Sequence, residues 1–596
     1  MTRAFVFALI GGLALLGEAA CEGPARKPSG GSQHKTDAAG KEKPEGKAAL
    51  PAPEKPVGAP RGPGDPIARP GDAPSGPENP EPRPALAGQG NVLELPDAPG
   101  VTRLTSELAR EAPRVDLPVD RVVAQARAHC RTHWYGLYLQ GKKLGWAEMG
   151  CAVAPWQGRE VVERRSRMVM EAKMYATEVK IEITSTMRFA AQGRGELLSY
   201  EYRQDGAQQR KTLSIQRGAS GWTAEQTYRA GKISKPGTRR VLPELRTALG
   251  NSEMAVTTLL LEGKLTPGAR YRYLELDPED VEERESAAQL LGQAERVVQG
   301  VKTRLYKMEV MELHRKLRGE TVMDSSGNWL DGSVQGTIRI RREEKATARR
   351  MDPTAGDFGL GAVIRAPMNV AEPGKVRQLR LGLTGYLPPG LEGSSRHKLT
   401  KLGPKEAELT ITREPLGGLP TTLLPQLEER FPKELAATEQ IESRHPEILA
   451  LGRRAVAGES HALPAARKIT AFVYGYLKKS LSTNLDSALA ISRAKAGDCT
   501  EHARLMVALC RAVGLPAREL GGVTWVPDLG GFGYHAWVEV WVGRWVSADP
   551  AWNELPANAT HILMGGPEDV QWIGTLGNLK VSVLGFELEP QAAPKR

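Results

Sequence analysis

The sequence predicts an α+β protein, in which a disordered N-terminal spacer precedes large antiparallel β-rich domains and a C-terminal core of helices and sheet. Three observations predict this: 17 of the 43 prolines fall within residues 22–100, strand-like alternation fills residues 130–345, and a buried helical pattern after residue 495 is followed by an alternating hairpin. With 40% hydrophobic and 25% charged residues, the composition is that of a soluble globular protein and argues against a membrane bundle. Five cysteines in 596 residues are too few for a disulfide-stapled scaffold.

These shifts in composition divide the chain into five parts. They are a signal peptide (1–20), a disordered Pro/Gly-rich linker (21–100), a β-rich antiparallel domain (101–345), a smaller β-rich segment (346–430) and a C-terminal domain (431–596).

The N-terminus has the pattern of an export signal. Arg3 precedes an uncharged apolar run over residues 4–17, which at about 14 residues is too short to span a bilayer but suits a signal-peptide core. Cys21 follows two alanines and resembles the lipidated cysteine of bacterial lipoproteins, although Glu18 departs from that pattern and plain cleavage is the alternative. We therefore expect an exported protein of the cell envelope, periplasmic or at the surface, with Cys21 as a membrane tether.

Residues 22–100 predict a spacer, because they are rich in Pro, Gly, Ala, Lys and Glu and cannot bury enough apolar surface to offset the entropy of ordering. This stretch carries 10 basic and 11 acidic side chains, so the net charge of +11 lies elsewhere, in the strand-rich middle. Export makes nucleic acid a poor partner for that positive charge. An anionic envelope polymer or lipid headgroups fit better, and a merely solvated surface is the default.

Alternation begins near Thr132 and predicts a large antiparallel sheet or half-barrel over roughly 130–345, with helical patterns near residues 107–128 and 242–263. Cys130 and Cys151 flank its first hairpin. In an exported protein they could form a disulfide, and two reduced buried thiols are the alternative.

A helix is predicted to begin at Cys499. Asp498 with Glu501 three residues later has the spacing of a capping box, and Gly514 before Pro516 ends the helix. Unpaired N–H groups and the positive end of the helix dipole meet at its first position, so Cys499 is expected to favour the thiolate, the form that acts as a nucleophile.

The hairpin that follows supplies an imidazole and a carboxylate. Residues 533–542 alternate and place His535 and Trp537 on one face of a strand. A two-residue turn would point Asp549 away from His535, whereas a three-residue loop over 542–544 would set Trp541 opposite Trp545 and bring Asp549 diagonally beside His535. We predict the three-residue loop. Cys499 as nucleophile, His535 as base and Asp549 as the acid that orients the imidazole then form a relay.

These motifs resemble the transglutaminase-like superfamily. They are Gly-Asp-Cys-x-Glu-x-Ala over 497–503, Gly-Leu-Pro-Ala-Arg over 514–518, His-Ala-Trp-Val-Glu-Val over 535–540 and Trp…Asp-Pro over 545–550. The resemblance covers roughly 480–585 and implies a papain-like core whose Cys499, His535 and Asp549 carry out acyl transfer on amide bonds. A side-chain oxyanion donor upstream of the cysteine is implied as well, with Asn484 as a weak candidate.

The predicted function is that of an exported transglutaminase-like enzyme with a protein or peptide substrate and no cofactor, acting as a peptidase, a deamidase or a Gln–amine cross-linker. The alternative is a non-catalytic binding or assembly protein in which the β-rich domain does the work. Trp537 is a weak candidate for lining a substrate groove, with sheet core as its commoner fate. His502 and His535 do not amount to a metal site, since no second Cys/His pair has metal spacing, and no metal is expected.

Overall fold

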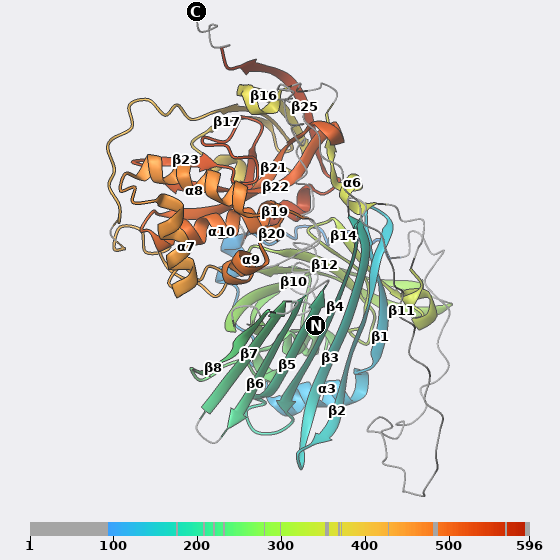
Figure 1. The fold of residues 1–596 in the computed structure, drawn as a ribbon. Helices are drawn as coiled ribbons and strands as arrows, with labels where there is room; N and C mark the ends of the chain where they lie inside the picture. The colour runs from blue at the N-terminus through green and yellow to red at the C-terminus, as the bar shows by residue number, and fades with distance from the viewer. Residues whose placement is uncertain are drawn as a thin grey trace, which may run out of the picture. The chain divides into compact units, whose positions relative to one another are not determined.

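Figure 1 shows the chain as a computed structural model. The structure describes residues 93–174, 177–206, 209–218, 221–230, 233–278, 281–298, 300–351, 357–366, 370, 372–426, 428–480, 487–566 and 569–590. The predicted signal peptide, most of the linker, the lipidation candidate Cys21 and the oxyanion candidate Asn484 lie outside these residues. Over the residues that the structure describes, the fold is mostly β, with 47% strand against 22% helix. No helix in the described part of the chain is long and apolar enough to cross a membrane.

A 14-stranded sheet occupies the middle of the chain, and its neighbouring strands pair antiparallel. Strands β1 to β8 are laid down outward in chain order, and β9 to β14 return from the other edge until β14 pairs with β1 (Figure 1). The bounds are β1 Thr132–Leu139, β2 Lys142–Trp156, β3 Arg159–Met174, β4 Thr177–Ala190, β5 Leu197–Gly206, β6 Gln209–Gly218, β7 Gly221–Ala230, β8 Ile233–Leu242, β9 Arg270–Asp277, β10 Glu282–Val298, β11 Val301–Glu312, β12 Arg318–Met323, β13 Trp329–Val334 and β14 Ile338–Glu343.

Among the helices that pack with this sheet are α2 (Ser106–Glu111), α3 (Val119–His129) and α4 (Glu253–Leu261). The helical pattern over 107–128 is divided in two, because Pro113 and Pro118 interrupt it and the chain between them bonds outward instead. Val115 N–H donates to the Arg272 carbonyl, and Leu117 N–H donates to the Gly250 carbonyl. The pattern over 242–263 shrinks to α4, preceded by a short 3₁₀ turn, η1 (Leu249–Asn251).

Cys130 and Cys151 are bonded to each other, with their Cα atoms 5.1 Å apart. Cys130 caps the C-terminus of α3 and Cys151 lies in β2, so the bond ties this helix end to the sheet.

A four-stranded sheet has the order β17-β18-β16-β25, with β16 (Val376–Gly385), β17 (His397–Gly403), β18 (Glu406–Thr412) and β25 (Leu579–Leu588). Its last strand comes from the end of the chain, inside the predicted 431–596 domain, and pairs with β16. The short elements that precede or interrupt this sheet in the chain are α5 Lys345–Arg349, α6 Phe358–Ala362, β15 Ile364–Arg365, η2 Pro373–Lys375 and η3 Pro389–Glu392. Of these, α5 packs against β1 and β2 of the 14-stranded sheet, α6 packs against β3, and β15 pairs with β22.

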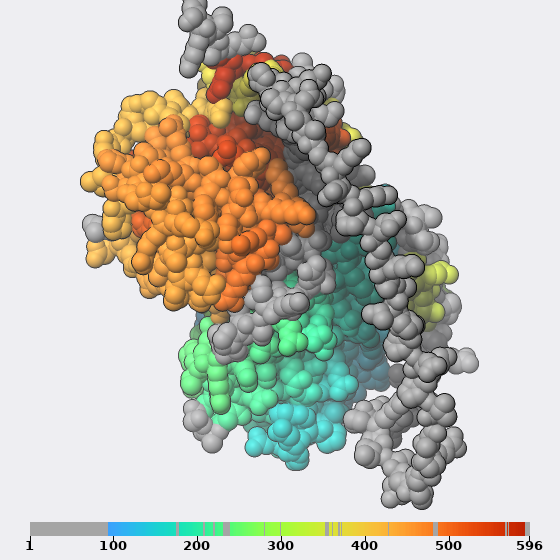
Figure 2. All heavy atoms as spheres, viewed as in Figure 1, coloured from blue at the N-terminus to red at the C-terminus, as the bar shows by residue number. Residues whose placement is uncertain are grey.

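The C-terminal core places helices against a five-stranded sheet of order β15-β22-β21-β24, with β23 also paired to β22. In Figure 2 orange spheres, the colour of α7 and α8, form the surface of this core on the face drawn. Helix α10 is buried from Cys499 to Cys510. The bounds are α7 Pro446–Val456, α8 Ala462–Tyr476, β19 Lys478–Lys479, α9 Ala488–Ala494, β20 Ala496–Gly497, α10 Cys499–Ala512, β21 Ala517–Val526, η4 Pro527–Leu529, β22 Gly531–Trp541, β23 Trp545–Ala548, β24 Ile562–Gly565 and η5 Val570–Thr575.

The predicted apolar stripe of α10 packs into a single core. Met506, Val507 and Cys510 of α10 join Ile448 of α7 and Val538 of β22 in one buried cluster. Because every residue from Cys499 to Cys510 is buried, the helix N-terminus is held in a fixed place within the core.

Candidate active site

Cys499 is the first residue of α10, as the capping-box spacing predicts. The Asp498 side chain accepts a hydrogen bond from Thr500 N–H at 2.9 Å, and the Glu501 carboxylate accepts one from Asp498 N–H at 2.8 Å. The two bonds fix the first turn, so the Cys499 side chain is held at the positive end of the helix.

The hairpin after β21 has the predicted register. Trp541 pairs with Trp545 and Val540 with Val546, so three residues form the loop, and Gly543 takes a positive φ of 98°. This confirms the odd-length loop. Glycine suits the position because a Cβ is disfavoured at such a φ.

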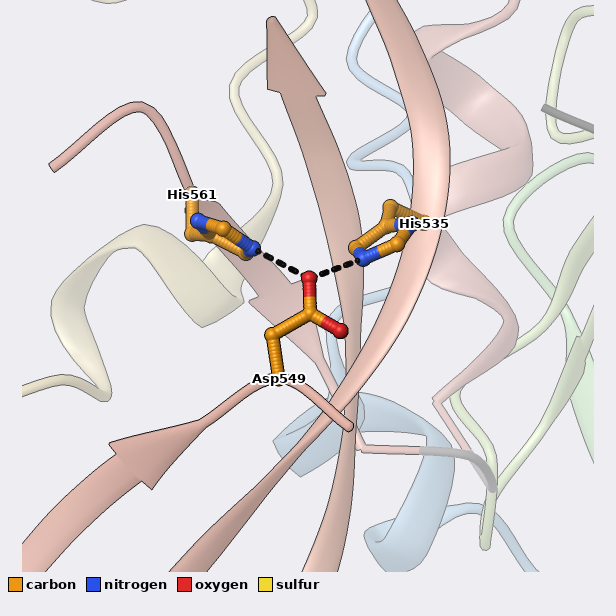
Figure 3. A group of neighbouring side chains, drawn as sticks. All are labelled: His535, Asp549 and His561. Atoms are coloured by element: carbon orange, nitrogen blue, oxygen red, sulfur yellow. Dashed lines mark hydrogen bonds and ion pairs between the residues drawn. The ribbon is translucent and has the colours of Figure 1, made fainter. Parts of the chain in front are cut away.

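His535 and Asp549 lie in direct contact, as Figure 3 shows. His535 Nε2 lies 2.8 Å from Asp549 Oδ2, with both side chains buried. With Nε2 turned toward the carboxylate, Nδ1 is the ring nitrogen that can exchange a proton with another group.

Asp549 is held from both sides. Its Oδ1 accepts hydrogen bonds from Ala551 N–H at 2.8 Å and Trp552 N–H at 3.3 Å, and Oδ2 contacts His561 Nε2 at 3.2 Å as well as His535. Burial raises the pKa of Asp549, but its pairing with His535 and His561 outweighs burial and holds the pKa well below the ordinary value. The group is therefore a carboxylate at neutral pH.

Trp552 connects this pair to the cysteine. Cys499 packs with Ala551, Ala536 and Trp552 in one small apolar cluster. The Trp552 ring stacks on His535 with the ring centroids 4.8 Å apart. Cys499 thus shares a cluster with Trp552, whose ring stacks on His535 and whose backbone N–H bonds to Asp549.

His561, which sequence analysis did not single out, is the residue added to the site by the fold. It follows the loop after Pro556 and precedes β24, and it is 1% exposed. No spacing or periodicity marks it, because it reaches Asp549 only through the pairing of β24 with β21.

Among the described residues, one group has the composition and proximity to hold a metal ion: His535, Asp549 and His561, whose ligand atoms lie within 4.8 Å of one another. Their contacts of 2.8 and 3.2 Å are N–H···O hydrogen-bond distances, so direct bonding among the three accounts for the arrangement. His502 is not a member of the group. Its Nδ1 lies 2.6 Å from the Asp498 carbonyl oxygen, to which it donates.

The remaining residues considered in the sequence lie in the core. Trp537 is 1% exposed and packs with Leu520 and Leu563. It therefore lies in the sheet core, which was one of the two positions expected for it, the other being a substrate groove. Its ring also lies 5.1 Å from that of His561. Cys510 is buried, and burial raises the pKa of its thiol far above the ordinary value.

A buried ion pair supports the loop that carries Asp549. Arg396, just before β17, contacts Glu414 at 3.2 Å and donates to Ser547 Oγ at 3.0 Å and to the Asn558 carbonyl at 2.6 Å. Glu414 in turn accepts from Ser547 N–H at 2.9 Å. Two residues of the smaller β-rich segment thereby hold both ends of the Asp549 loop.

Comparison with known proteins gives one family match. A family model described as the transglutaminase-like superfamily matches residues 449–550. No curated protein matches the chain. The matched span includes Cys499, His535 and Asp549.

Two solved structures show low overall similarity. A candidate cysteine protease from Cytophaga hutchinsonii is 14% identical with a TM-score of 0.25, over 36% of this chain and 86% of that chain. A β-barrel-like protein with a domain of unknown function from Brucella abortus is 10% identical with a TM-score of 0.27, over 36% of this chain and 96% of that chain. At these TM-scores neither supports an argument about activity.

The family match confirms the resemblance carried by the sequence motifs. Residues 449–550 of this chain are a domain of the transglutaminase-like superfamily.

Proposed function

We propose that this chain is an exported, cysteine-dependent acyl-transfer enzyme that acts on amide bonds of proteins or peptides in the bacterial cell envelope, through a papain-like α+β core. The observation that carries the proposal is the buried contact of 2.8 Å between His535 Nε2 and Asp549 Oδ2, with Cys499 packed against the indole that stacks on His535. A signal-like N-terminus and Cys21 support export and a lipid tether.

In the first half of the reaction, the Cys499 thiolate attacks the carbonyl carbon of a Gln side chain or a peptide bond. The tetrahedral oxyanion forms near the positive end of α10, which stabilises negative charge. The C–N bond then breaks as His535 Nδ1–H gives its proton to the leaving nitrogen, which leaves a Cys499 thioester and ammonia or an amine.

In the second half, His535 takes a proton from the resolving nucleophile, which attacks the thioester carbon. Water yields a carboxylic acid, the outcome of a peptidase or deamidase, and an amine yields a new amide, the outcome of a cross-linker. Sulfur leaves, and His535 returns the proton to it. Asp549 stays ionised throughout and stabilises the imidazolium.

The test compares two cysteines of one protein. After reduction and desalting, iodoacetamide is applied to the native full chain, and tryptic peptides 496–504 and 505–511 report Cys499 and Cys510 separately. We expect Cys499 to react at least about 100-fold faster near neutral pH, because a buried neutral thiol is inert. His535→Ala should remove that advantage.

The acyl-transfer step is tested with a Gln-containing protein and a fluorescent primary amine, with ammonia release and peptide-bond cleavage measured in parallel. Any one of the three products, lost in Cys499→Ala, supports the enzyme. Slow labelling of Cys499 with none of the three products contradicts it.

One observation favours the alternative of a non-catalytic binding or assembly protein. Cys499, His535 and Asp549 are 1%, 5% and 0% exposed, so a substrate reaches them only if neighbouring side chains move. In that case the transglutaminase-like core is a structural module, the β-rich domain binds the partner, and an anionic envelope polymer is the ligand to test first.

A further inference from the structure

His561 is a buried titratable group that contacts Asp549 and that the proposed mechanism does not use. Its Nε2 lies 3.2 Å from Asp549 Oδ2, and its Nδ1 lies 3.2 Å from the Asn558 carbonyl oxygen. Both neighbours are acceptors, and a neutral imidazole carries only one N–H to give.

The charged groups around His561 settle where that proton lies. Burial lowers the pKa of His561 to about 4, with His535 and Arg396 also lowering it and Asp549 opposing them. The ring is therefore neutral at pH 7. A carboxylate is a stronger acceptor than an amide carbonyl, so the N–H sits on Nε2 and points at Asp549.

The His561 ring is itself held in place. Trp537 and Trp552 lie edge to face against it, with centroids 5.1 and 5.5 Å away. The Asn558 side chain accepts from Thr560 N–H at 2.8 Å and from Thr560 Oγ1 at 2.6 Å, which fixes the turn that leads into His561. Because the ring is held this firmly, its N–H can fix the orientation of the Asp549 carboxylate that accepts from it.

We propose that His561 is a positioning residue, whose Nε2–H fixes Asp549 Oδ2 on the line to His535 Nε2 and so holds the imidazole in the orientation that leaves Nδ1 for the proton transfers of the proposed mechanism. This inference rests on the proposed function for its effect on turnover. The backbone donors from Ala551 and Trp552 fix Oδ1, and His561 fixes the second oxygen, so the carboxylate cannot rotate away from His535. Being neutral, His561 leaves the charge of the His535–Asp549 pair unchanged.

The experiment compares two substitutions at one position. His561→Phe keeps an aromatic ring and removes the donor, whereas His561→Gln keeps a side-chain N–H that can reach Asp549. His397→Phe is the matched control. His397 is a partly buried imidazole beside β24 that bonds to backbone groups, the Leu391 and His561 carbonyls and Leu563 N–H, so its loss removes an imidazole near His561 without removing a donor to Asp549.

The readout is the pH profile of Cys499 alkylation, measured on peptide 496–504 of the reduced full chain. We expect His561→Phe to slow alkylation at pH 7 by about 10-fold to 100-fold and to raise the pH of half-maximal reactivity by about one unit, since a misplaced carboxylate stabilises the imidazolium less well. His561→Gln should recover most of both effects, and His397→Phe should leave the pH profile unchanged.

Three outcomes would overturn the inference. A folded His561→Phe protein with an unchanged pH profile would show that His561 only packs. A Gln variant no better than Phe would show that the ring and not the donor matters. Stoichiometric zinc in the isolated wild-type protein, lost in both variants, would make His561 a metal ligand instead.

A spectroscopic measurement on the wild-type chain covers the case in which His561→Phe does not fold. In ¹⁵N-histidine-labelled protein, His561 should appear as the neutral Nε2–H tautomer at pH 7, and the Nδ1–H tautomer or a charged ring contradicts the proposal. Neither readout needs a substrate. Failure to find acyl transfer would therefore count against the proposed function and leave this inference separately testable.

Discussion

Asp549 shows how much of this site depends on one carboxylate. Its two oxygens face four nitrogens, two from the backbone and two from imidazoles, and none of the carboxylate is exposed. Burial without such partners would protonate the group, so the ring of donors is what keeps it charged. In the proposed mechanism, a charged, fixed Asp549 stabilises the protonated form of His535.

Glu554, five residues further on, has the opposite environment. Burial raises its pKa to about 7, with the charge of Asp549 adding to the effect and hydrogen bonds from Asn558 opposing it. Backbone hydrogen bonds in both directions between Asp549 and Glu554 close the loop between them, so the two carboxyl groups stay close.

A stability prediction follows for Glu554→Gln. Below about pH 4.5 the carboxyl is protonated in the folded and unfolded chains alike. Between pH 4.5 and 7 only the unfolded chain loses the proton, so the free energy of unfolding falls with rising pH, by up to about 3 kcal/mol above pH 7. Gln cannot ionise and should flatten this fall. Chemical denaturation at pH 5 and pH 8 measures it, with exposed Glu406→Gln as the control; a wild-type fall that persists in Glu554→Gln contradicts the assignment.

Sequence reasoning finds the site residues whose positions depend on local rules. The capping box predicts that Cys499 begins the helix. Strand alternation and loop length predict that Asp549 lies beside His535, and each of these rules acts over about a dozen residues of chain. His561 could not be found this way. Its contact with Asp549 needs β24 to pair with β21, and a remote Arg396 to hold the Asn558 carbonyl, and neither leaves a local pattern.

At the scale of elements, α10 packs against β22 and places Cys499 near the sheet that carries His535. Its N-terminus is fixed by two capping bonds, and its C-terminus ends at Gly514, which has a positive φ of 74° and donates its N–H to the Arg511 carbonyl. The capped helix therefore holds the Cys499 side chain at a fixed place in the core.

Asp498→Ala tests the cap. We expect it to lower the free energy of unfolding by about 1 to 2 kcal/mol and to slow Cys499 alkylation, because the first turn frays and the cysteine leaves its place. Thermal unfolding followed by tryptophan fluorescence and peptide-resolved alkylation measure the two effects. Thr105→Ala removes the cap of α2 and should leave the Cys499 rate unchanged. If Asp498→Ala lowers the stability but Cys499 is still alkylated at the wild-type rate, the cap does not control the reactivity of Cys499.

The predicted helical patterns near 107–128 and 242–263 show where local rules fail at this scale. Their residues have suitable periodicity, but Pro118 removes a donor and Leu117 N–H finds its partner at Gly250, more than a hundred residues away. Backbone hydrogen-bond partners this far away in the chain compete with the hydrogen bonds of a helix, and the periodicity of apolar residues does not reveal them.

At the scale of the whole molecule, the C-terminal core is completed by residues outside the 431–596 span expected from the sequence. β15 pairs with β22, β16 pairs with β25, and Arg396 and Glu414 hold the strand that leads to Asp549. Composition does not reveal this arrangement, because a short strand such as β15 has no periodicity to read. Strands β15 and β16 are therefore paired with strands of the span that follows them, whereas α6 packs against β3 of the 14-stranded sheet.

The pairing of β15 and β16 with later strands determines where this core can be cut. A fragment of residues 357–590 keeps β15 to β18, whereas a fragment of 431–590 loses them and leaves Val581 and Val583 of β25 without the strand they pack beside. It also loses Arg396, whose donors satisfy the Ala557 and Asn558 carbonyls, and an unsatisfied buried carbonyl costs about 1–3 kcal/mol.

We therefore expect the 357–590 fragment to be soluble, to melt cooperatively and to keep fast alkylation of Cys499. The 431–590 fragment should aggregate, or its Cys499 and Cys510 should be alkylated at the same rate. A third fragment, 357–577, lacks only β25 and separates the loss of the strand pair from the loss of Arg396. Size-exclusion chromatography, circular dichroism and the peptide assay measure all three. If 431–590 melts at the same temperature as 357–590 with the same Cys499 rate, the segment over 357–414 does not contribute to the site, and the contacts of Arg396 and Glu414 are dispensable.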